Sequence, residues 1–210
     1  MSEEKTSHEF VPERNYNSKI GKGLIEEFYK PALAECVLYQ RCAGYFSSTF
    51  FIYVMKETLE FSKRNGRIQL VTSPNLATAD KDMIEKCMQN PEKTLSEIFF
   101  DGLNNDPDNL KNDCAKLMGW MLAHKVNGHP QLEIKIHAGP ELYHEKICIM
   151  HYPDDKRISF MGSNNETGKA MNENVESFRV FCSWIDSDYR DVVHDQRYFS
   201  RLWNNEIDKV

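Results

Sequence analysis

Short runs of apolar residues alternate along the chain with longer segments in which apolar residues recur at helical spacing. The short runs predict strands over residues 36–46, 68–72, 132–136, 142–151, 156–162 and 175–184. The longer segments predict helices over residues 23–36, 50–64, 79–88, 93–100, 108–126 and 188–206. The first two strands are joined by a helix, whereas the last three follow one another closely. The pattern therefore predicts an α/β fold in which helices sandwich a mixed β-sheet.

The first 17 residues show neither period. They are rich in Glu, Ser and Asn, which predicts a mobile tail over residues 1–17. A chain of 210 residues is large enough for one well-buried core but cramped for two. Residues 18–210 are therefore predicted to form a single domain. Pro31 lies inside the first predicted helix and indicates a kink or a restart there.

Composition describes an ordinary soluble protein, with 40% hydrophobic and 28% charged residues. No apolar run reaches the roughly 18 residues of a membrane span, and the polar N-terminus is unlike a secretory signal. The six cysteines form no Cys-x-x-Cys pair, which is typical of reduced thiols. We therefore expect a cytoplasmic protein with no membrane partner. Because the formal charge is −6, any phosphate-binding surface must be local.

Two short motifs supply candidate chemistry. His144 and Lys146 are two residues apart on a predicted strand, so their side chains point the same way. Ser163 and Asn165 have the same spacing in the Gly-Ser-Asn-Asn segment that begins at residue 162. If the two segments pair, an imidazole, an ammonium, a hydroxyl and an amide meet at one point. These groups are suited to bind and attack a phosphate without a metal.

The two motifs resemble the HxK…GSxN signature, or HKD motif, of the phospholipase D superfamily. Asn174-Val175-Glu176 is similar to the Asn-x-Glu that opens the next strand in many members with one motif. Residues 42–47, with the sequence CAGYFS, resemble an early strand of the PLD-like nucleases found in restriction enzymes and beside helicases. The resemblance implies a phosphodiesterase, and specifically a metal-independent endonuclease that acts on DNA. It also implies a module of a longer restriction or helicase-type defence protein.

The chemistry of phosphodiester cleavage gives each residue a role. His144 is the predicted nucleophile, because a covalent phosphohistidine divides one difficult displacement into two. Lys146 would neutralise the non-bridging oxygens, to which Ser163 and Asn165 would donate hydrogen bonds. Glu176 would accept a hydrogen bond from the far ring nitrogen of His144 and fix its tautomer. No metal or cofactor is required.

The resemblance also implies a homodimer, because the chain contains one motif and the family site needs two. His144 of the second copy would then protonate the leaving oxygen. Tyr45 and Ser47 are the predicted substrate contacts, with the Tyr45 ring stacking on a base. The chain departs from the family at the motif aspartate, whose position holds His151. A longer hairpin turn after this strand is the predicted consequence.

Other interpretations remain open at this point. The chain could be a phospholipase or phosphatidyl transferase, or a non-catalytic module that binds nucleic acid. The seven histidines permit a metal site, for example at His137, His144 and His151, although no cysteine pair accompanies them. A small basic cluster at residues 63, 64 and 67 could touch nucleic acid or form a solvated face.

Overall fold

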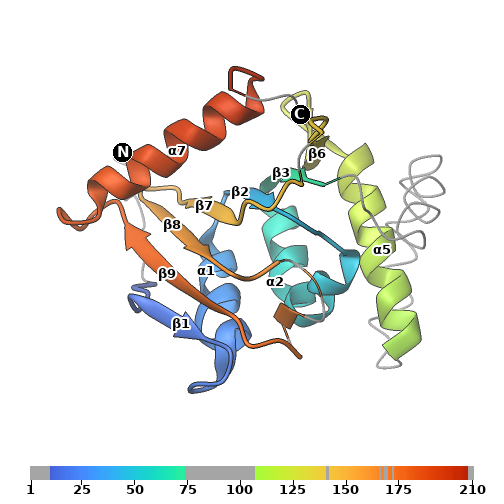
Figure 1. Cartoon of the computed structure of the whole chain (residues 1–210). Coiled ribbons are helices and arrows are strands. Elements are labelled where there is room, and N and C mark those ends of the chain that lie inside the picture. The colour runs from blue at the N-terminus through green and yellow to red at the C-terminus, as the bar shows by residue number, and fades with distance from the viewer. Residues whose placement is uncertain are drawn as a thin grey trace, which may run out of the picture.

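A seven-stranded mixed β-sheet forms the centre of the protein in a computed structural model (Figure 1). The structure describes residues 10–73, 107–140, 142–165, 167, 170–171 and 173–207, and only the backbone of 107–112. The strand order is β1-β9-β8-β7-β2-β3-β6. The strands are β1 (Asn15–Asn17), β2 (Leu38–Ala43), β3 (Arg67–Thr72), β6 (Leu132–Ile136), β7 (Ile147–His151), β8 (Arg157–Gly162) and β9 (Ser177–Cys182). A separate two-stranded ribbon pairs β4 (Lys125–Val126) with β5 (His129–Pro130).

The pairing directions bring several strand ends to the same edge of the sheet. Strands β2, β3 and β6 are parallel, whereas β7, β8, β9 and β1 continue the sheet in antiparallel pairs. The C-terminal ends of β2 and β8 therefore lie beside the first residues of β7 and β9. We call this edge the site edge, because all the predicted catalytic residues follow or precede these strand ends.

Helices cover both faces of the sheet (Figure 1). One face packs against η1 (Ile25–Tyr29), α1 (Lys30–Glu35), η2 (Ser48–Phe50), α2 (Phe51–Lys63) and α5 (Pro107–Ala123). The other face packs against α7 (Tyr189–Trp203), whose Phe199 and Leu202 bury Ile147 and Ile149 of β7. The predicted α/β class, with a mixed sheet sandwiched by helices, is confirmed.

Most predicted elements are present but shorter than their apolar runs. The run over 142–151 forms a strand only from Ile147 onward, and the run over 36–46 stops pairing at Ala43. The backbone leaves the ladder at the site edge, and the predicted catalytic side chains therefore lie on loops. Pro31 marks a restart, because the helix changes from π to α geometry at Lys30. The predicted helices over 79–88 and 93–100 lie outside the described residues.

The prediction of a tail over residues 1–17 is wrong for its last three residues. Asn15–Asn17 forms the edge strand β1, antiparallel to β9. Tyr16 is buried and its ring lies 5.3 Å from that of Phe178 and 5.0 Å from that of Phe28. A strand of three residues shows no periodicity in sequence, and aromatic packing from distant segments holds it in place. Residues 1–9 lie outside the described part.

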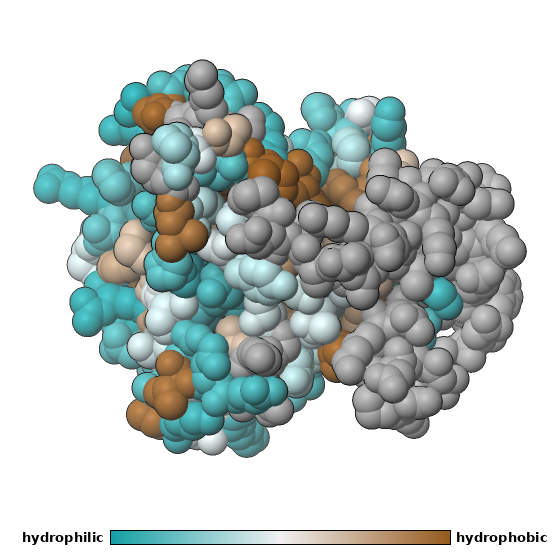
Figure 2. Space-filling model, turned by 45° about the vertical axis from the view of Figure 1, so that its right-hand side comes forward, coloured by the Kyte–Doolittle hydropathy of each residue, from teal (hydrophilic) through white to brown (hydrophobic). Residues whose placement is uncertain are grey.

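Two features bear on the predicted class of protein. Cys36, Cys42, Cys114, Cys148 and Cys182 are free thiols buried in the core, and Cys87 lies outside the described residues. No described helix combines the length and the apolar character that crossing a bilayer requires. Figure 2 shows one face of the molecule, on which hydrophilic residues surround smaller hydrophobic areas.

Candidate active site

The site edge brings together segments that are far apart in sequence. Gly44 directly follows β2, and a Cβ atom added to it would lie 3.2 Å from the Tyr143 carbonyl oxygen and 3.3 Å from the His144 Cα. Any side chain here would require the neighbouring backbone to shift by a few tenths of an ångström, so glycine favours this close approach. The Tyr45 amide then donates a hydrogen bond of 3.1 Å to Asn165 Oδ1. His144, Tyr45 and Asn165 thus lie around one stretch of backbone.

His144 and Lys146 immediately precede β7. The His144 side chain is exposed, whereas Lys146 is only 7% exposed. Lys146 Nζ donates a hydrogen bond of 3.0 Å to the His144 carbonyl oxygen. The ammonium is therefore held beside the backbone of the predicted nucleophile, where a single positive charge can attract an anionic substrate.

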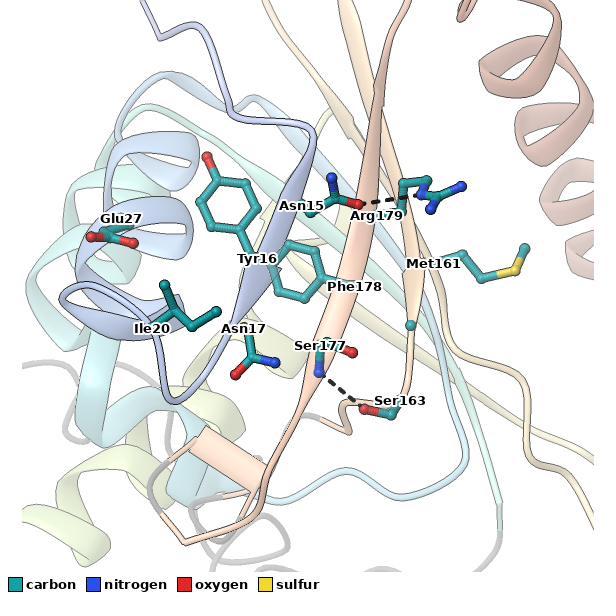
Figure 3. Close-up of a pocket in the computed structure, with 11 residues that line it drawn as sticks. Asn15, Tyr16, Asn17, Ile20, Glu27, Met161, Ser163, Ser177, Phe178 and Arg179 are labelled. Atoms are coloured by element: carbon teal, nitrogen blue, oxygen red, sulfur yellow. Dashed lines mark hydrogen bonds between the residues drawn. The ribbon is translucent and has the colours of Figure 1, made fainter.

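Glu176 is a buried carboxylate with two hydrogen-bond donors. Ser163 Oγ donates to Oε2, and Asn174 Nδ2 donates to Oε1 at 3.0 Å. Ser163 Oγ also accepts from the Ser177 amide at 3.2 Å, as Figure 3 shows. The predicted bond from His144 to Glu176 is not formed in the described chain. A carboxylate that is 6% exposed needs donors, and the neighbouring hydroxyl and amide supply them.

Ser18 holds the Asn174–Glu176 segment in place. Its Oγ donates to the Asn174 carbonyl and accepts from the Glu176 amide, both at 3.0 Å, and its own amide donates to the Glu176 carbonyl at 2.9 Å. The sequence alone does not indicate this role of Ser18. Its partners lie more than 150 positions away, so no local sequence pattern predicts these contacts.

Arg41 supports the Ser163–Asn165 segment from the interior of the protein. This residue of β2 is fully buried, and its Nη2 donates to the Asn164 carbonyl at 2.5 Å. Its guanidinium also lies 5.2 Å from the centre of the Phe160 ring. Asn164 Nδ2 in turn donates to the Tyr29 hydroxyl at 2.5 Å. An arginine inside the apolar run 36–46 was the available signal, because buried charges are kept only where they are bonded.

The two predicted substrate contacts have different positions. Tyr45 is 36% exposed beside Asn165 and remains a candidate. Ser47 is buried, and its Oγ accepts hydrogen bonds from the Thr49 amide at 3.3 Å and from the Thr49 hydroxyl at 3.0 Å. Its side chain caps η2, as serine often does at a helix start. The structure thus gives Ser47 a structural role, and its substrate contact stays a prediction.

The other polar clusters noted in the sequence serve the fold. Arg67 pairs with Glu133 at 2.7 Å, and Arg64 donates to a backbone carbonyl at 3.1 Å. The His137 ring stacks on that of Tyr143 at 4.9 Å. Within the described ranges, no three His, Cys, Asp or Glu side chains are grouped to hold a metal ion.

His151, at the position of the family aspartate, lies at the opposite end of β7 from His144. Its Nε2 is 2.9 Å from Gln40 Oε1, which also accepts from Gln196 Nε2 of α7 at 3.0 Å. Burial, assisted by the positive charge of Arg157, lowers the pKa of the imidazole to about 4. This residue belongs to the packing of α7 against the sheet, away from the site edge.

We expect His151 to make stability depend on pH. Its imidazole is neutral in the folded protein down to about pH 4, whereas the unfolded chain protonates it near pH 6.5. Between these values the unfolded state binds more protons, so stability falls as the pH falls, by up to about 3 kcal/mol. Urea unfolding of wild type and His151→Gln at pH 4.5 and 7 measures this. An equal pH dependence in both proteins would contradict the assignment.

Comparison with known proteins places the chain in a family. The family model described as "Cardiolipin synthase, PLD-like domain" matches residues 40–203. The chain therefore belongs to this family of PLD-like domains, within the phospholipase D superfamily. No curated protein sequence matches it significantly.

Several solved structures have a similar fold. Nuc from Salmonella typhimurium, a phospholipase D family member, is 14% identical with a TM-score of 0.47, and the match covers 88% of this chain and 91% of that one. For yeast tyrosyl-DNA phosphodiesterase the identity is 11%, the TM-score is 0.41, and the match covers 70% of this chain and 25% of that one. Phosphatidylserine synthase from Haemophilus influenzae is 10% identical with a TM-score of 0.46, and the match covers 87% of this chain and 38% of that one.

Proposed function

We propose that the protein is a metal-independent phosphodiesterase that cleaves DNA through a covalent phosphohistidine. The observation that supports this most is the meeting of the His144–Lys146, Ser163–Asn165 and Glu176 segments at the site edge. Nucleophile, cation and hydrogen-bond donors are the groups that displacement at an anionic phosphorus needs. Glu176 acts as a positioning residue that orients the Ser163 hydroxyl.

The reaction proceeds in two displacements. A neutral His144 imidazole attacks phosphorus, a nitrogen–phosphorus bond forms, and the bond to the leaving oxygen breaks. His144 of the partner subunit gives its proton to that oxygen. The same imidazole, now neutral, then takes a proton from water, whose oxygen attacks phosphorus and breaks the bond to His144. Lys146 balances the charge of the non-bridging oxygens in both steps.

A homodimer completes this site, because each chain supplies one His144. We further propose that the substrate is DNA and that the domain works in the cytoplasm as a module of a restriction or helicase-type protein. Tyr45 supports a nucleic acid substrate, because it offers a partly exposed ring beside Asn165 on which a base can stack. Because the net charge is −6, the surface that attracts the DNA phosphates must be local.

Trapping the intermediate tests the reaction class. The protein is incubated in EDTA with a DNA oligonucleotide labelled at the scissile phosphate, quenched in alkali and digested. We expect DNA cleavage and a phosphorylated peptide that contains His144. The control is Glu145→Gln, which changes the exposed neighbour and should leave the adduct in place.

Four results would contradict parts of the proposal. Loss of cleavage in EDTA would exclude the metal-independent reaction, and an adduct on another residue would exclude His144 as the nucleophile. Headgroup release from phosphatidyl vesicles without DNA cleavage would assign a lipid substrate. This alternative is tested because the description of the family names a lipid synthase. A monomer by light scattering would remove the shared site.

A further inference from the structure

An open groove of about 560 Å³ runs along the sheet between β1, β9 and β8 and begins at Ser163 (Figure 3). Its lining includes Asn15, Asn17, Ile20, Glu27, Ser163 and Arg179. Ser163 is the one predicted catalytic residue in its wall. The groove therefore extends away from the site, and we call it the β1–β9 groove.

We propose that the β1–β9 groove binds the nucleotide next to the scissile phosphate and that Arg179 binds that nucleotide's phosphate. This inference rests on the proposed function. It assigns a substrate subsite and a specificity-determining residue to a surface that the HKD motif does not include.

The register of the strands sets the distance from the reaction. The Ser163 amide donates to the Ser177 carbonyl at 3.0 Å, so the two residues are neighbours across β8 and β9. Arg179 lies two residues farther along β9, and its side chain leaves the sheet on the same face as Ser177, roughly 7 Å away. Adjacent phosphates of an extended nucleic acid strand have a comparable separation.

The Arg179 side chain lines the groove and is joined to β1 by a hydrogen bond. Its Nε donates to Asn15 Oδ1 at 3.3 Å, as Figure 3 shows, and β1 thereby fixes the plane of the guanidinium. In the described part of the chain its two terminal nitrogens bind no other residue. A planar pair of donors that is held in place and exposed to solvent is the arrangement that binds a phosphate at low entropic cost.

The opposite wall suits the uncharged part of a nucleotide. Ile20 lies in the loop after β1 with 69% of its surface exposed, and it lines the groove (Figure 3). Glu27 also lines the groove, and it accepts a hydrogen bond from the Lys22 amide at 2.8 Å. This carboxylate repels phosphate, so the backbone must follow the Arg179 side. The apolar and amide side chains of Ile20 and Asn17 then face the sugar and the base.

The test compares a substrate that reaches the groove with one that does not. Arg179→Gln should lower kcat/KM for an oligonucleotide about 10- to 100-fold. It should change hydrolysis of bis(p-nitrophenyl) phosphate, which has no neighbouring phosphate, less than twofold. The dependence of log KM on log salt should become less steep by about 0.7 for a single strand. Arg179→Lys should recover part of the loss, and Arg197→Gln on the exposed face of α7 is the matched control.

The outcomes separate this inference from the proposed function. If the wild type hydrolyses both substrates and Arg179→Gln does so equally well, the groove does not bind substrate. If Arg179→Gln impairs both substrates and lowers the Tm, the residue only joins β1 to β9. If the wild type hydrolyses neither, the proposed function fails. In that case, fluorescence anisotropy compares the affinity of the oligonucleotide for the wild type and for Arg179→Gln. Equal affinities would show that the groove does not bind the oligonucleotide.

Discussion

Replacing His144 by alanine is expected to reduce EDTA-resistant DNA cleavage at least about a thousandfold. In the proposed reaction, the imidazole supplies the nitrogen that bonds to phosphorus in the first displacement, and across the dimer it supplies the proton for the leaving oxygen. Neither Lys146 nor Ser163 can replace it in both roles. Because the side chain is exposed, the fold should persist and the Tm should change little. Plasmid nicking in EDTA, followed over time on gels, measures the loss.

The matched control is His194→Ala, which removes an exposed histidine of α7 whose Nδ1 lies 3.6 Å from Asp195. It should cleave DNA like the wild type. Cleavage by His144→Ala within tenfold of the wild-type rate would contradict the assignment of the nucleophile. If wild type and variant bind DNA equally and neither cleaves it, the domain is a binding module, and the catalytic proposal is wrong.

Replacing Gly162 by alanine is expected to give the largest loss of stability. A Cβ atom there would lie 2.6 Å from the Phe178 Cα, and closer still to the Ser177 carbonyl oxygen. These are backbone atoms of the paired strand β9, so they cannot rotate away as the end of a side chain could. Overpacking of this kind costs about 3 kcal/mol or more, which corresponds to a Tm lower by roughly 6–12 °C.

The substitution should also reduce activity, because separating β8 from β9 moves Ser163 away from Glu176. Thermal unfolding by circular dichroism measures the first effect and DNA cleavage the second. Met161→Ala, at the preceding and exposed position of β8, is the control and should shift the Tm by no more than a few degrees. A Gly162→Ala protein as stable as the wild type would show that the two strands separate easily at this end.

The sequence by itself determined the class of fold and the order of the motifs. Period and turn residues are local properties, so the strand around Ile68 and the helix that ends near Trp203 could be predicted from neighbouring residues. The prediction that His144 and Lys146 project alike from a strand is wrong, because β7 begins only at Ile147, and His144 is exposed whereas Lys146 is buried. These motifs also carried the family resemblance, which the match over residues 40–203 confirms.

Only the tertiary structure decided which residues support the site. Arg41, Ser18 and Asn15 act through partners more than 100 positions away, and no period in the sequence relates them. The same reason explains why Asn15–Asn17 forms a strand where the sequence predicts a tail. It also explains why the sequence does not predict that Ser47 caps η2. A polar side chain alone does not show whether it faces substrate or satisfies a buried backbone group. That choice depends on which strands become neighbours, and the sheet order sets it.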